Sequence, residues 1–252
     1  MFPGMATHTK INLPTNMSLD QWKTVGGCVV RVLRDSNRTE DIVTSEELAA
    51  QAQLHHLKHS GVMTGGEGPD IMRERPHFGD VDFDALRALP ATTLGGAFVR
   101  FMDDNGLSSS LYDIPAKYTA DPDEAYLMVR IRHSHDLWHV LTDLGVEGHD
   151  EILLHSFSLA QTGMPSSVLL MVLGSLKHML LEARFGLLRS GLLAAFRRGR
   201  AASPLLTVYW ERHFEESLVS VRERYGIRPW TSRDKQASQP WRWAGPLAAD
   251  LS

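Results

Sequence analysis

The segment from Asp121 to Asp143 constrains the fold of this chain more than any other. Asp121, Pro122 and Glu124 supply a capping residue, a proline at the first helical position and an acid at the third, so a helix starts here. Apolar residues surround much of its circumference, which predicts a central and largely buried helix. Its polar side chains then need partners or a bound ion, because an unpaired charge is costly to bury.

The polar residues in the second half of this helix are typical of metal ligands. His135 and His139 lie one turn apart on one face, and Asp136 lies about 100° around the helix from His135. Glu151 comes twelve residues after His139, in the first turn of the next predicted helix. Imidazoles and carboxylates together suit a divalent ion of zinc, iron, manganese or cobalt. The absence of a nearby Cys argues against a closed structural zinc site. We therefore predict an open metal site between two antiparallel helices.

Helical patterns also cover the rest of the chain, and no convincing alternating strand is present. The fold class is therefore all-α, and we predict a single-domain helical bundle over residues 19–230, with an arm over residues 1–18 and a tail over residues 231–252. The predicted helices are residues 19–34 behind a Ser18–Gln21 capping box, a second helix capped by Thr44 or Ser45, a short helix before Pro76, then 83–89, 94–104, 121–143, 150–162, 166–181, 187–196 and 205–225. Gly61 to Gly68 is predicted to be a loop.

Composition excludes several classes of protein. A net charge of -4 and a pI near 6.3 do not favour nucleic acid as a partner. Cys28 is the only cysteine, so no internal disulfide can form, and we expect a cytoplasmic protein. The first residues resemble neither a secretory signal nor a transit peptide, and no apolar run is long enough to span a membrane.

Two other groups of residues have more than one interpretation. His55 and His59 are also one turn apart, but no carboxylate accompanies them on that face before Gly61 and Lys58 is adjacent, so we interpret them as a solvated polar face. The apolar region after Ser166 is punctuated by cations, which form either ordinary solvated helix faces or a surface for anionic lipid or an isoprenoid phosphate. These cations are Lys177, Arg184, Arg189, Arg197, Arg198 and Arg200.

The segment His135-Asp-Leu-Trp-His139, with Glu151 after eleven further residues, resembles the His-Asp-x-x-His-x(11)-Glu motif of the ubiquinone (coenzyme Q) biosynthesis protein 4 family. The similarity extends from about Trp22 to Pro229. It includes Arg75-Pro76, Leu89-Pro90, Thr93-Leu-Gly95, Phe101, Asn105-Gly-Leu107, His139-Val-Leu-Thr142, Ala160-Gln-Thr-Gly163 and Tyr209-Trp-Glu211. The Gly61 to Gly68 loop, the Ser108 to Ser110 run and the tail depart from the family.

This resemblance implies an enzyme of ubiquinone biosynthesis that oxidatively decarboxylates a 4-hydroxy-3-polyprenylbenzoate derivative, replacing the carboxyl group at C1 with hydroxyl. His135, Asp136, His139 and Glu151 would be the metal ligands and catalytic residues, with a divalent metal ion as cofactor. The apolar helices around Leu169 to Leu193 would hold the prenyl chain. The protein would associate peripherally with the inner membrane, bind other ubiquinone biosynthesis proteins and form a homodimer. The alternative is a non-catalytic scaffold and polyprenyl-lipid-binding protein that organises those enzymes.

Two other classes of metalloenzyme fit the motif less well. A His-Asp phosphohydrolase needs an upstream His and a distant Asp that are not evident in this chain. A zinc protease of the His-Glu-x-x-His kind needs Glu as general base where Asp136 stands, and Asp is shorter by one methylene.

Overall fold

A computed structural model gives the structure of residues 11–12, 14, 17–34, 38–146, 148–168, 171, 185–232 and 234–235. Over these residues the chain is helical and has no strand, and an isolated bridge joins Thr93 and Ser217. The predicted all-α fold is therefore confirmed. The arm, most of the tail and most of the predicted helix 166–181 lie outside the described residues, so the predicted domain limits stay a prediction.

The described helices agree with most of the predicted ones. They are α1 (Leu19–Arg34), α2 (Thr39–His59), α3 (Gly68–Glu74), α4 (Phe83–Ala88), α5 (Leu94–Asp104), α6 (Pro122–Thr142), α7 (Gly148–Thr162), α9 (Phe185–Ala201) and α10 (Leu218–Arg224). Short 3₁₀ helices occupy Val62–Thr64, Phe78–Asp80, Ser109–Asp113, Leu205–Thr207 and Trp210–Arg212.

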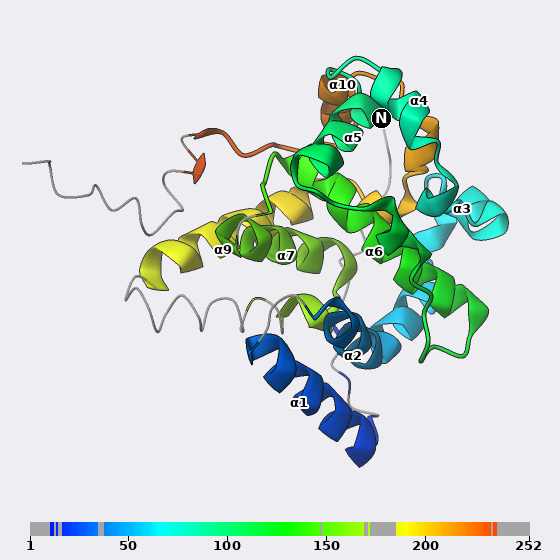
Figure 1. Ribbon diagram of the computed structural model, residues 1–252, viewed down its shortest axis with the longest axis vertical. Helices are drawn as coiled ribbons and strands as arrows, with labels where there is room; N and C mark the ends of the chain where they lie inside the picture. Colours follow the sequence, from blue (N-terminus) through cyan, green and yellow to red (C-terminus); the bar gives the residue numbers. More distant parts are fainter. Residues whose placement is uncertain are drawn as a thin grey trace, which may run out of the picture.

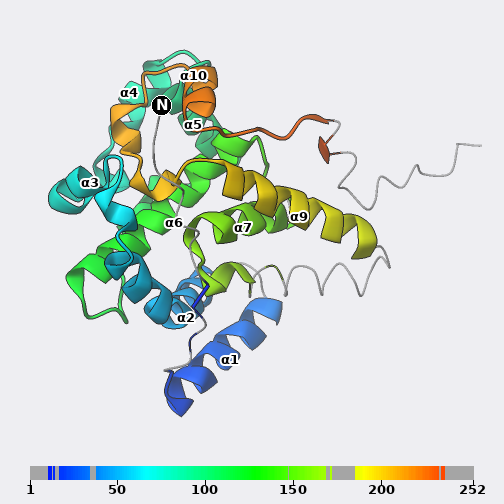
Figure 2. The same cartoon turned by 180° about the vertical axis from the view of Figure 1, so that it is seen from behind.

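Helix α6 runs through the middle of the molecule, with α2 on one side and α5 on the other (Figures 1 and 2). As predicted, the Asp121 carboxylate caps it by accepting from the backbone N–H groups of Asp123 and Glu124, at 3.0 and 3.1 Å. The helix takes part in two apolar clusters. Trp138 and Leu141 pack in one with α5, α7, α9 and α10, whereas Leu127 and Ile131 pack in the other with α2 and α3. This double role explains why apolar residues surround α6.

Helix α1 begins with the predicted capping box. The Ser18 hydroxyl accepts from the N–H of Gln21, and the Gln21 side chain accepts from the N–H of Ser18, at 3.2 and 2.8 Å. Val25 and Cys28 are buried, as their spacing predicts. The helical spacing predicts Trp22 on the same buried face, but half of it is exposed, because α1 lies at the edge of the molecule and packs mainly on α2 (Figure 1).

Helix α2 begins at Thr39, so the predicted cap at Thr44 or Ser45 is wrong. Asp41 in its first turn pairs with Arg31 of α1 at 2.7 Å and also with Arg38. These pairs stabilise a first turn that has no side-chain cap. The pair with Arg31 depends on a neighbouring helix, so the local sequence did not indicate this start. Ser45 instead donates its hydroxyl to the carbonyl of Ile42 inside the helix.

The prediction of one continuous helix over residues 205–225 is also wrong. Only Leu218–Arg224 is α-helical, and 3₁₀ turns precede it. The carbonyls of Phe214 and Glu216 accept from the N–H groups of Gly95 and Leu94, both at 2.8 Å, so this segment satisfies its backbone groups against the start of α5. Of the apolar residues that the helical spacing places on one stripe, Trp210, Phe214 and Val221 are buried nevertheless, and Leu218 is partly buried against the same core.

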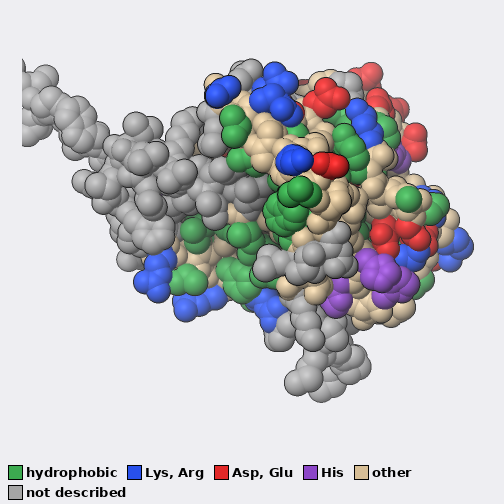
Figure 3. All heavy atoms as spheres, turned by 90° about the horizontal axis from the view of Figure 1, so that it is seen from below, with side chains coloured by type: hydrophobic (Ala, Val, Ile, Leu, Met, Phe, Trp, Pro, Cys, Tyr) green, Lys and Arg blue, Asp and Glu red, His purple; other side chains and the backbone are tan. Residues whose placement is uncertain are grey.

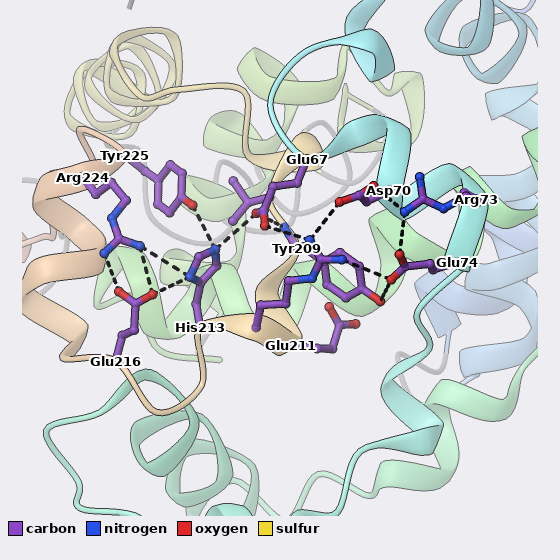
Figure 4. Close-up of polar contacts among 12 residues, drawn as sticks. Glu67, Asp70, Arg73, Glu74, Tyr209, Glu211, His213, Glu216, Arg224 and Tyr225 are labelled. Atoms are coloured by element: carbon purple, nitrogen blue, oxygen red, sulfur yellow. Dashed lines mark hydrogen bonds and ion pairs between the residues drawn. The ribbon is translucent and has the colours of Figure 1, made fainter. Parts of the chain in front are cut away.

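A polar network holds this irregular segment to its neighbours, and Figure 4 shows it. His213 contacts Glu67 at 3.2 Å and Glu216 at 2.6 Å, and Arg224 of α10 also pairs with Glu216. Arg212 pairs with Asp70 and Glu74 of α3. The network therefore joins the Gly61 to Gly68 region, α3, the 205–217 segment and α10.

Candidate metal centre

Helices α6 and α7 bring the predicted ligands together. Asp143, with φ 60°, ends α6 in the left-handed region, and the Asp150 carboxylate accepts from the N–H of Gly145 at 2.8 Å in the turn. Glu151 lies in the first turn of α7, as predicted, so it faces the last two turns of α6. The turn thus converts a sequence spacing into a site between two helices.

The Glu151 carboxylate lies between the two predicted histidines. Its Oε1 is 3.0 Å from Nε2 of His135, and its Oε2 is 3.1 Å from Nε2 of His139. One donor atom from each of these residues lies within 4.8 Å of the other two. The histidine rings are 5.0 Å apart and nearly perpendicular. These three side chains therefore converge on one point.

Asp136 is oriented differently. Its Oδ2 accepts a hydrogen bond from the hydroxyl of Tyr112 at 2.9 Å, and Asp136 does not belong to the group of converging donor atoms. Tyr112 is buried beside the core. The role of Asp136 as a metal ligand stays a prediction. Its Oδ1 is not hydrogen-bonded to Tyr112 and is the oxygen that would bind the ion.

His155 was missed by the sequence analysis. Its Nε2 lies 3.2 Å from Oε1 of Glu151, and its ring lies 5.1 Å from that of His135. His155 follows Glu151 by four residues, so once α7 is predicted the helical spacing places both on one face. That spacing was the signal available in the sequence.

The surroundings of His139 orient its ring. Its Nδ1 lies 3.2 Å from the carbonyl oxygen of Leu144, and its ring stacks on Phe101 at 5.2 Å. A proton on Nδ1 would be donated to that carbonyl, which leaves the Nε2 lone pair facing Glu151. A ligating histidine held through its other nitrogen is common in metal sites.

The electrostatics of the group suit a cation. Burial disfavours the His135 cation, but the attraction of Glu151 outweighs it and raises the pKa of His135 to about 9. Burial also acts against the Glu151 anion, yet the neighbouring imidazoles, chiefly His135, hold the pKa of Glu151 well below its usual range. Burial raises the pKa of Asp136. A divalent ion at this position would compete with a proton for His135, because an imidazole must lose that proton before it can bind metal.

Arg132 lies on the same helix, three residues before His135. Its guanidinium donates from Nη1 to the carbonyl of Ile114 at 3.1 Å, and Nε is 3.8 Å from a Glu46 oxygen. Nε and Nη2 of Arg132 are buried and have no hydrogen-bond partner within the described part of the chain. By contrast, the fully buried Arg130 pairs with Glu211 and donates to the Val208 carbonyl. Arg130 leaves only its Nε without a hydrogen-bond partner, whereas Arg132 leaves both Nε and Nη2 without one among the described residues.

The donor set fits a divalent transition-metal ion. Two imidazoles and a carboxylate are ligands that zinc, iron and manganese accept, and three protein ligands leave a position for substrate. Cys28 lies in α1 and is hydrogen-bonded to Arg31, so it does not contribute to the site.

Comparison with known proteins agrees with the motif. The family described as "Coenzyme Q (ubiquinone) biosynthesis protein Coq4" matches residues 9–231. The chain belongs to this family. Its role is therefore in ubiquinone biosynthesis.

Individual relatives span most of the chain. The Nematostella vectensis protein named "Ubiquinone biosynthesis protein COQ4 homolog, mitochondrial" is 34% identical over 74% of this chain and 88% of its own length. The Coprinopsis cinerea protein named "Ubiquinone biosynthesis protein COQ4, mitochondrial" is 27% identical over 94% of this chain and 79% of its own. A crystal structure of a Nostoc punctiforme PCC 73102 protein assigned to ubiquinone biosynthesis has a TM-score of 0.64 and 25% identity, covering 81% of this chain and 97% of that one.

Proposed function

We propose that this member of the family catalyses the metal-dependent oxidative decarboxylation of a 4-hydroxy-3-polyprenylbenzoate derivative, with dioxygen as the oxidant, in which the carboxyl group at C1 leaves as carbon dioxide and hydroxyl replaces it. The main support is the convergence of His135, His139 and Glu151 on one point, with the buried Nε and Nη2 atoms of Arg132 on the same helix. That combination offers one site for a divalent ion and an adjacent site for an anionic group.

His135, His139 and Glu151 would hold the metal, and Asp136 would complete the set through Oδ1. When bound, the ion would orient the carboxylate or phenolate of the substrate and stabilise negative charge that develops as carbon dioxide leaves. Tyr112 would hold Asp136 in place through its hydrogen bond. His155 would orient Glu151.

Arg132 would bind the substrate carboxylate. Its Nε and Nη2 atoms make no hydrogen bond with the described residues, and these are donors that a carboxylate engages in a bidentate pair. Two anionic ligands neutralise a divalent ion, so the guanidinium would balance the extra charge of the substrate.

Helix α9 would contribute to a membrane-facing surface. Leu193 is exposed at 44%, and Arg189 and Arg197 are exposed on the same helix. Figure 3 shows Lys and Arg side chains interspersed with hydrophobic ones on the side of the molecule where α9 lies. Arg198 instead pairs with Asp234. Such a surface attracts anionic lipid.

Peripheral attachment to the inner membrane is part of the proposal. None of the helices within the described residues is long and apolar enough to cross a membrane. The polyprenyl chain would lie against the apolar region 169–193, most of which lies outside the described residues. Other ubiquinone biosynthesis proteins and a second copy of this chain would be its protein partners.

A turnover experiment tests the proposal. Purified protein is reconstituted with zinc, iron(II), manganese or cobalt and incubated in air with a short-chain 4-hydroxy-3-prenylbenzoate derivative, and the product is followed by mass spectrometry. We expect metal-dependent loss of carbon dioxide with gain of hydroxyl, and none with His135→Ala. No turnover with any ion, while the prenylated ligand still binds, would favour the scaffold.

Metal content gives a second measurement that does not depend on activity. Glu151→Gln is nearly isosteric but loses the anionic ligand, so we expect it to fold and to bind metal more weakly at this centre. Elemental analysis after dialysis, with circular dichroism as the control for folding, measures this. Unchanged metal affinity would remove Glu151 from the ligand set.

A further inference from the structure

A second group of metal-binding side chains lies where α2 meets α6. His55 and His59 are one turn apart near the end of α2, with ring centroids 4.4 Å apart. Oε1 of Glu124, from the first turn of α6, lies 2.9 Å from Nδ1 of His55. One donor atom from each residue lies within 4.8 Å of the other two. The sequence near His55 lacks a carboxylate on this face, and the fold supplies one from Glu124, which lies 69 residues after His55.

We propose that His55, His59 and Glu124 bind a divalent transition-metal ion, with zinc as the preferred species. Zinc accepts two imidazoles and a carboxylate at bonds of about 2.0 to 2.2 Å, which in a tetrahedral site places the ligand atoms roughly 3.3 Å apart. Nδ1 of His55 and Oε1 of Glu124, at 2.9 Å, are near this spacing, and a ring nitrogen of His59 lies within 4.8 Å of both. Water would fill the remaining position, since the site is at the surface.

Neighbouring charges do not compete for Glu124. Lys58 pairs with Asp121 at 2.6 Å and with Asp123 at 3.3 Å, and Arg75 also pairs with Asp123 at 2.6 Å. The proximity of Lys58 in sequence argued against a site, but its ammonium group is directed to these two carboxylates. Glu124 is thereby left to face the imidazoles.

The site is accessible to ions in solution. The His55 side chain is 68% exposed, whereas that of Glu124 is 14% exposed and therefore held in place. Figure 3 shows histidine side chains gathered beside acidic ones on the face seen from below. A partly buried carboxylate with exposed imidazoles allows an ion to bind without any opening of the fold.

The site is separate from the candidate metal centre. Glu124 precedes His135 by eleven residues of α6, which is about 16 Å along the helix axis. Ions at the two positions therefore share no ligand. An ion held by His55, His59 and Glu124 would link α2 to α6 and stabilise the folded chain, because the unfolded chain does not hold the three ligands together.

Zinc stoichiometry tests the proposal. The full chain is stripped of metal with a chelator, dialysed and titrated with zinc in a calorimeter. We expect two zinc ions per wild-type chain, and one for both the His55→Ala/His59→Ala double variant and Glu124→Gln. His56→Ala is the matched control and should retain two, because His56 lies on the same helix outside the group.

The same titration with Glu151→Gln distinguishes the two sites. This variant should lose the zinc bound at the candidate metal centre and keep the one bound by α2 and α6. Both histidines are exposed, so their replacement should leave the circular dichroism spectrum unchanged. Glu124→Gln tests the same zinc site through a different ligand. Either of two results would overturn the proposal. The first is an unchanged zinc stoichiometry in both the double variant and Glu124→Gln. The second is a wild-type chain that binds one zinc ion, which Glu151→Gln then fails to bind.

Discussion

At the scale of single residues, Glu151 is the side chain on which the candidate metal centre depends. Its Oε1 faces His135 and His155, and its Oε2 faces His139. A carboxylate shared among three imidazoles has little freedom to rotate, so the ligand atoms are organised before an ion arrives. Such organisation reduces the entropy lost when a metal binds.

His155 provides a test of this organisation. We expect His155→Ala to weaken zinc binding at the centre by about 10 to 100-fold, which is the usual effect of removing a group that orients a metal ligand. His155→Gln keeps a hydrogen-bond donor and should lose less. Competition with a chromogenic chelator measures the affinity. Equal affinities for His155→Ala and the wild type would show that Glu151 needs no such support.

At the scale of elements, α7 and α9 pack closely along the side of the molecule (Figures 1 and 2). Gly199 of α9 makes this possible. A Cβ added there would lie 2.6 Å from the carbonyl oxygen of Phe157 and 2.8 Å from Cβ of Ala160. The helices would have to separate, and α7 bears Glu151.

We therefore expect Gly199→Ala to lower the free energy of unfolding by about 1 to 3 kcal/mol, as overpacking typically does. Gly26→Ala in α1 is the matched control. A Cβ at Gly26 meets nothing within 4 Å, so the change should raise that free energy by roughly 0.5 to 1 kcal/mol through helix propensity. Urea unfolding at pH 7 measures both, and a stabilised Gly199→Ala protein would contradict the packing argument.

At the scale of the whole molecule, the network around His213 connects segments that are far apart in the sequence (Figure 4). Among the acidic residues of this network, Glu216 has the pKa that is lowered furthest. Arg224 and then His213 lower the pKa of Glu216 from 4.5 to about 2. A carboxyl group whose folded pKa is depressed stabilises the fold at pH values above its unfolded pKa, and this contribution disappears as the pH falls.

The stability of the protein should therefore fall between pH 4.5 and 2, in part through Glu216. We expect Glu216→Gln to be less stable than the wild type at pH 7 and the two proteins to converge as the pH approaches 2. Urea unfolding at pH 7, 5 and 3 provides the comparison. A constant difference in free energy across this range would show that Glu216 does not contribute through its charge.

The sequence by itself determined the features that depend on neighbouring residues. The Asp121 cap, the buried circumference of α6 and the common face of His135 and His139 all follow from local hydrogen bonding and from the helical repeat. The motif with Glu151 also sufficed to indicate the family.

The tertiary structure decided what depends on distant partners. It extended α2 to Thr39 through an ion pair with α1, and it broke the predicted helix 205–225 because the start of α5 takes up its carbonyl groups. It also placed Tyr112 against Asp136 and Glu124 against His55. The physical reason is that a helical repeat is specified within one turn, whereas pairing between distant side chains depends on how the helices pack.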